Sequence, residues 1–125
     1  MRFVARAYKD RNEVVIVRED GKVKTVSYLH WMAYLNKCLN GNFAHLCRRS
    51  LIVGYGNLWV GVVKDREIMP EDLEELKGIV DYFNIPDFAF EEAVALMYSR
   101  DSLFDLSCAG CEGGKEVLRA SEATA

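Results

Sequence analysis

The sequence predicts an α+β fold: an antiparallel-rich sheet of about five strands with three helices in a single compact domain. Residues 51–63, LIVGYGNLWVGVV, read as two apolar strands on either side of a Gly-Tyr-Gly-Asn break. Residues 70–98 carry apolar residues at helical spacing, behind a proline and a cluster of acidic residues. With 125 residues, half of them apolar, the chain can bury a core of its own.

Period-two and continuous apolar runs predict the strands, and the glycines and Asn57 supply the turn between the last two. The predicted strands are 2–8, 13–19, 22–27, 50–55 and 58–64. Asp20-Gly21 is a strong signal for a two-residue hairpin turn, which would place Val17 opposite Lys24. We therefore expect a well-formed hairpin between the second and third strands.

Residues 14–17 and 51–63 are apolar without strict alternation. A strand uses such a pattern when both of its faces are covered. Two arrangements satisfy it: helices on both sides of the sheet, or helices on one side and another protomer on the other.

The helices are predicted at 28–40, 70–83 and 88–98. Ser27 can cap the first helix, and its buried stripe is predicted to be Tyr28, Met32, Leu35 and Leu39, with Trp31 and Tyr34 beside it. Residues 42–50, NFAHLCRRS, are expected to form a helical turn or short helix before the fourth strand. The two later helices are expected to pack as a pair.

Domain boundaries are predicted from composition. Residues 1–106 form the α+β domain, and 107–125, rich in Gly, Ser, Ala and Glu, form a flexible tail. Cys108-Ala-Gly-Cys111 has the spacing of half a zinc site, which Cys38 and Cys47 could complete, with His45 a further candidate ligand. A single CxxC is weak evidence, so we favour unligated thiols and expect no cofactor or metal.

Four cysteines are too few for a disulfide scaffold of this length, and charges interrupt the start of the chain where a signal peptide needs an apolar core. No apolar run approaches the ~20 residues that span a bilayer. A cytoplasmic protein without a membrane segment is expected.

The net charge of -3 hides an asymmetry between the two halves of the chain. Residues 1–66 hold twelve Lys and Arg against five Asp and Glu, whereas residues 67–125 hold four against fourteen. Either acidic helices neutralise a basic sheet within one molecule, or the surface is bipolar and recruits an anionic ligand or a second copy.

A basic and aromatic surface is the candidate binding site. Its residues are Trp31, Tyr34, Lys37, His45, Arg48 and Arg49. A solvated basic corner is the simpler explanation of these charges, and we favour it over a binding site when the charges are taken alone. With no catalytic signature in the sequence, we expect a small non-enzymatic binding module, an inhibitor or adaptor acting on a larger protein or nucleoprotein machine.

The alternative function is a small nucleotide- or RNA-processing enzyme, nuclease-like, that uses His30 or His45 with Arg48 and Arg49. These two histidines are the side chains that titrate near neutrality when unperturbed. We also expect a homodimer formed through the sheet or its edge, because three helices would leave part of one sheet face bare.

Overall fold

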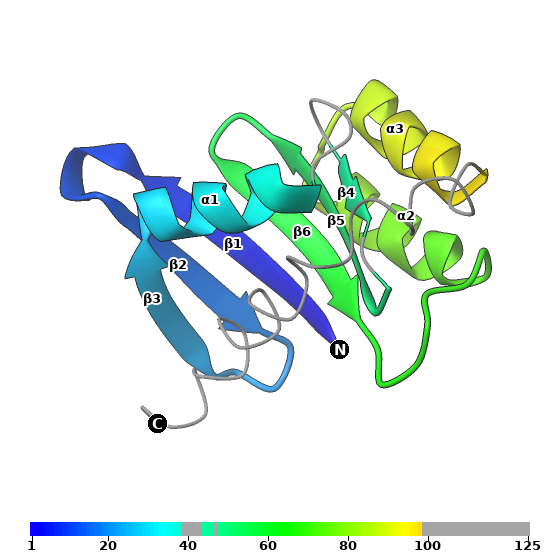
Figure 1. The fold of residues 1–125 in the computed structure, drawn as a ribbon, viewed down its shortest axis with the longest axis horizontal. Helices are drawn as coiled ribbons and strands as arrows, with labels where there is room; N and C mark the ends of the chain where they lie inside the picture. The colour runs from blue at the N-terminus through cyan, green and yellow to red at the C-terminus, as the bar shows by residue number, and fades with distance from the viewer. Residues whose placement is uncertain (39–43, 47, 99–125) are drawn as a thin grey trace.

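The computed structural model describes residues 1–38, 44–46 and 48–98. Six strands and three α-helices make up this part of the chain (Figure 1). In order they are β1 (Arg2–Tyr8), a 3-10 turn (Lys9–Arg11), β2 (Glu13–Arg18), β3 (Val23–Ser27), α1 (Tyr28–Cys38), β4 (Ala44–Leu46), β5 (Ser50–Tyr55), β6 (Leu58–Val63), α2 (Asp72–Tyr82) and α3 (Asp87–Tyr98).

The strands form one sheet in the order β3-β2-β1-β6-β5-β4, and every neighbouring pair is antiparallel. Two three-stranded meanders, β1 to β3 and β4 to β6, therefore meet at the β1–β6 pair. The five predicted strands and three predicted helices are confirmed, with ends that differ by up to two residues. The predicted tail, 107–125, lies outside the described residues.

β4 is the sixth strand, and it occupies a segment predicted to be helical. Ala44 and Leu46 are both buried and lie opposite Val53 and Leu51 of β5. Their spacing of two residues is that of a strand with one face in the core. The helical prediction was wrong here because a three-residue strand at a sheet edge is too short to show a period.

The β2–β3 hairpin forms, but its register differs by one residue from the predicted one. Val17 lies opposite Val23. Arg18 N donates to the Lys22 carbonyl (2.9 Å) and Gly21 N donates to the Arg18 carbonyl (3.0 Å), which closes a three-residue loop. Gly21 has φ +86°, so a left-handed glycine completes this loop where a two-residue turn was predicted.

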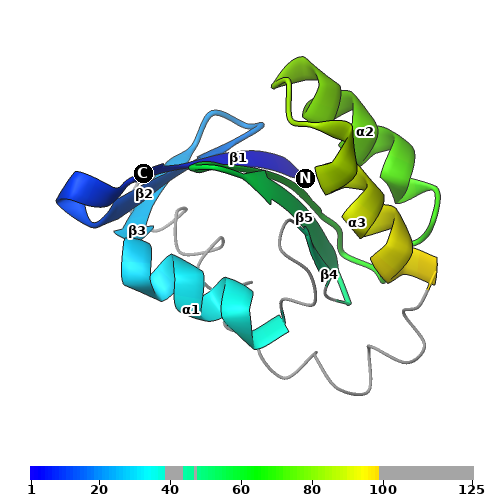
Figure 2. The same ribbon diagram turned by 90° about the horizontal axis from the view of Figure 1, so that it is seen from above.

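Helices cover both faces of the sheet, as Figure 2 shows: α1 lies on the concave side, and α2 with α3 lies on the convex side. The first of the two predicted arrangements is therefore present. The core on the α2 and α3 side includes Val53, Val60, Leu76, Val80 and Leu96. Because β5 and β6 contribute buried side chains to both layers, their continuous apolar sequence is explained.

The core on the α1 side is aromatic. The Trp31 ring lies 5.8 Å from the Trp59 ring and 6.4 Å from the Phe3 ring, measured between centroids. Gly54 lies opposite Trp59, and a Cβ added to Gly54 would lie 2.2 Å from Trp59 Cδ1. The glycine in this strand therefore makes room for the indole ring.

α2 has defined ends. The Asp72 carboxylate accepts a hydrogen bond from Met69 N (2.8 Å) at the start of the helix. At the other end Asn84 has φ 56°, and Ile85 N donates to the Val80 carbonyl (3.0 Å). This is the Schellman arrangement, with asparagine in the left-handed position.

Candidate functional site

The aromatic part of the predicted binding surface lies in the core. Trp31 is 0% exposed and Tyr34 is 5% exposed. Among the α1 side chains that the structure describes, Trp31, Tyr34 and Leu35 are buried, whereas Tyr28 and Met32 are only half-buried. Leu39 of the predicted stripe lies outside the described residues. The helix is thus rotated by about one residue from the predicted orientation, because the Trp31 indole packs against the rings of Phe3 and Trp59. These two aromatic side chains are not available to a partner.

The basic part of the predicted surface is divided between described and undescribed side chains. Lys37 lies in α1 and His45 lies in β4, but their side chains are outside the described part of the structure, as are those of Cys38, Cys47, Cys108 and Cys111. Arg48 and Arg49 are exposed. The predicted zinc ligands therefore stay a prediction.

Arg48 and Arg49, which we call the arginine corner, precede β5 on a fixed backbone. The Arg48 carbonyl accepts a hydrogen bond from Ile68 N (2.8 Å), and the Arg49 carbonyl accepts one from Lys64 N (2.9 Å). Within the described residues, neither guanidinium forms an ion pair. Two adjacent cations are thus held on a hydrogen-bonded backbone, and no described residue neutralises them.

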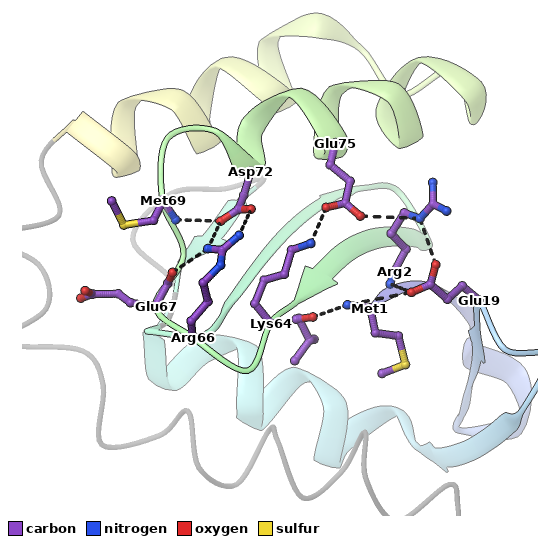
Figure 3. A network of polar contacts seen from close by, with 10 residues as sticks. Met1, Arg2, Glu19, Lys64, Arg66, Glu67, Met69, Asp72 and Glu75 are labelled. Atoms are coloured by element: carbon purple, nitrogen blue, oxygen red, sulfur yellow. Dashed lines mark hydrogen bonds and ion pairs between the residues drawn. The ribbon is translucent and has the colours of Figure 1, made fainter.

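The neighbouring cations are neutralised by α2 (Figure 3). Arg66 donates two hydrogen bonds to Asp72, at 2.8 and 2.9 Å, and Lys64 Nζ lies 2.7 Å from Glu75 Oε2. The Arg66 guanidinium lowers the pKa of the Asp72 carboxyl, and the same contact raises the pKa of Arg66. The structure thus shows acidic groups of the second half neutralising cations of the first.

A groove of about 510 Å³ runs between α2 and the β1–β2 part of the convex sheet face. Its floor and walls include Val4, Val17, Gly78, Ile79, Tyr82 and Phe83. Arg2, with its Nε 3.7 Å from Glu75 Oε1, lies at one end. The Arg6 guanidinium lies 5.8 Å from the Phe83 ring centroid at the other end. We call this feature the α2 groove. The groove was not predicted from the sequence, although a glycine within a helical pattern was a possible signal.

The chemistry of the described side chains is that of ion pairs and hydrogen bonds. The shifted pKa values belong to Glu19, Asp20, Arg66, Asp72 and Lys77, and hydrogen bonds to neighbouring groups are the largest cause of each shift. His30 is exposed in the first turn of α1, where its backbone N–H donates to Ser27 Oγ (3.0 Å). No group of three His, Cys, Asp or Glu side chains suited to a metal ion occurs among the described residues.

No helix of the described segments is long and apolar enough to cross a membrane. Comparison with protein-family models, curated proteins and solved structures finds no match for this chain.

Proposed function

We propose that this chain is a small non-enzymatic binding module, an inhibitor or adaptor of a larger protein or nucleoprotein machine. The observation that carries the proposal is the arginine corner: two exposed, adjacent guanidiniums on a backbone fixed by hydrogen bonds to Lys64 and Ile68. Arginine binds carboxylates and phosphates with two parallel hydrogen bonds, so such a pair suits an anionic partner surface.

The surroundings of the arginine corner favour this role. Lys64 is joined to Arg49 by a backbone hydrogen bond, and Arg66 follows two residues later. Both of these cations already have carboxylate partners from α2. Among the described side chains of this region, Arg48 and Arg49 are therefore the cations that a partner can neutralise. Because the backbone is already ordered, binding costs less conformational entropy than it would on a mobile loop. A cytoplasmic location and a homodimeric state, both expected from the sequence, are further parts of the proposal.

The test is to immobilise the full chain and two double variants of it, and to measure how much of each partner they capture from an extract of the native cell. Arg48→Glu with Arg49→Glu reverses the arginine corner. Lys9→Glu with Arg11→Glu makes the same change in net charge on the exposed 3-10 turn and is the matched control. We expect the first double variant to lose a partner that the wild type and the control retain.

Equal recovery of every partner by the wild type and the Arg48 and Arg49 double variant would overturn the proposal. Circular dichroism of each variant shows whether the fold is intact, so that loss of binding is not confused with unfolding. If the captured partner contains nucleic acid, its affinity for the wild type should also fall steeply with salt concentration, and this dependence should weaken in the double variant.

A further inference from the structure

The convex face of the sheet is only partly covered by the described helices. In Figure 2, α2 and α3 lie over the end of the sheet that holds β4, β5 and β6. On the same face Val4, Val17 and Val23 form one cross-strand row, since Val4 pairs with Val17 and Val17 with Val23. Val17 is 43% and Val23 51% exposed. This apolar row continues the floor of the α2 groove to the edge of the sheet.

Gly78 lies in the middle of α2 at the rim of this groove. Glycine is one of the least favourable residues in a helix interior. A Cβ added to Gly78 would meet no atom of the described residues within 4 Å, so packing among these residues does not explain the missing side chain. A small residue at this position would let a second helix pack closely against α2 from outside, since the distance between two packed helices depends on the side chains at their contact.

The α2 groove has an acidic side chain, Glu74, near one end and a basic side chain, Arg6, near the other. Glu74 lies one helical turn before Gly78, and no ion pair of its side chain occurs within the described residues. Arg6 lies at the opposite end, beside Phe83, and likewise makes no ion pair there. A ligand helix running along the groove would need a cation near Glu74 and a carboxylate near Arg6.

We infer that the occupant is a second copy of this chain, bound by packing α2 against α2 in antiparallel orientation around a two-fold axis at Gly78. Glu74 and Tyr82 are each about one turn from the glycine, so Glu74 of one copy lies opposite Tyr82 of the other. That is the end of the groove where Arg6 lies. The two-fold axis generates two such pairs, each between Glu74 of one copy and Arg6 of the other. It also places the two Glu74 side chains about two helical turns apart along the interface.

The apolar contacts follow the same symmetry. Tyr82 is 79% exposed, and it lies beside the rim that the second α2 would occupy. In the dimer its ring would be covered by the partner helix, together with the row of Val17 and Val23. Trp59 and Val60 are buried within each protomer and take no part.

The experiment measures molar mass by light scattering over a range of micromolar concentrations. We expect the wild type to have twice the 14.2 kDa mass of one chain. Gly78→Leu, which fills the rim with a good helix-forming residue, should weaken dimerisation at least about tenfold. Glu74→Arg and Arg6→Glu should each weaken it about tenfold, because each places like charges together.

The double variant Glu74→Arg with Arg6→Glu is the decisive sample, because it restores opposite charges between copies. We expect it to dimerise within about threefold of the wild type. Ala33→Leu, an exposed position on α1, is the control for added bulk and should change nothing. Circular dichroism establishes that each variant is folded.

Two results would overturn the inference, and they differ in what they mean for the proposed function. The inference rests on the homodimeric part of that proposal. A wild type that is monomeric at all concentrations refutes both. A dimer that Gly78→Leu leaves unchanged, or that the double charge variant fails to restore, refutes this interface and leaves dimerisation itself in place. The arginine corner is tested separately and is unaffected by either result.

Discussion

At the scale of single residues, Asp72 joins the first turn of α2 to the loop that follows β6. It is 4% exposed, yet its carboxylate has three donors: two from the Arg66 guanidinium and one from Met69 N. Burying a carboxylate is tolerated when its oxygens are hydrogen-bonded and paired with a cation. The contact therefore fixes where α2 begins relative to the sheet.

Replacing Asp72 with Asn should lower the free energy of unfolding by about 1–3 kcal/mol at pH 7, since Arg66 loses its charged partner. The pKa of Asp72 is lowered in the folded protein, mainly by the Arg66 hydrogen bond. The stabilisation is thus complete above the unfolded pKa of about 3.9 and is lost as pH falls through the folded value.

Urea denaturation of the wild type and of Asp72→Asn between pH 7 and pH 3 measures this contribution. The difference between the two should shrink at the acidic end. Glu91→Gln, an exposed position on α3, is the control and should change stability by less than about 0.5 kcal/mol. A constant difference at all pH values would mean that the Asp72 charge is not responsible.

At the scale of secondary-structure elements, two glycines have opposite roles. Gly54 is in β5, and a Cβ there would collide with the Trp59 ring at 2.2 Å. Gly54→Ala should therefore destabilise the protein by about 1–3 kcal/mol, because the indole must move in a packed core. Tryptophan fluorescence followed during urea denaturation checks this, and a stability equal to that of the wild type would show that the ring can move at no cost.

Gly78→Ala should have the opposite effect. The added methyl meets no atom of the described part of the chain, and alanine is more favourable than glycine in a helix by up to about 1 kcal/mol. The free energy of unfolding should rise by roughly that amount, measured by fluorescence at submicromolar concentration so that self-association does not contribute. A decrease would mean that the backbone of α2 at Gly78 is strained toward a conformation that alanine avoids.

The elements show how far the sequence could predict this structure. Turn residues and apolar runs located the five longer strands and the three helices, because those signals are local. The hairpin register was missed because Asp-Gly fits loops of two and of three residues. The orientation of α1 was missed because it depends on the contacts of Trp31 with Phe3 and Trp59, which are distant in sequence. The α2 groove was missed because it exists only after α2 is placed beside β1 and β2.

At the scale of the whole molecule, one sheet serves two cores. Trp31 and Trp59 both lie in the core on the α1 side, whereas Leu76 lies in the core on the α2 and α3 side. Since β5 and β6 contribute side chains to both cores, loss of packing in one core should also destabilise the other. The molecule is therefore expected to unfold as one cooperative unit.

Leu76→Ala tests this coupling. It should lower the free energy of unfolding by about 2–5 kcal/mol, since Leu76 is fully buried. Tryptophan fluorescence, which reports on the α1 side, and far-ultraviolet circular dichroism, which reports on the whole fold, should shift to the same lower urea midpoint. A fluorescence midpoint that stays at the wild-type value would show that the two cores unfold separately.

The arrangement of the sheet as two meanders also has a consequence for how the chain reaches its native state. Each meander pairs strands that are near in sequence, whereas the β1–β6 pair joins Arg2 to Val62. Closing so long a loop costs more entropy than forming either meander and slows the step that needs it. During synthesis, the edge of β1 that pairs with β6 stays unpaired until the ribosome has released β6. Refolding followed by stopped-flow fluorescence should therefore be limited by the joining of the two halves.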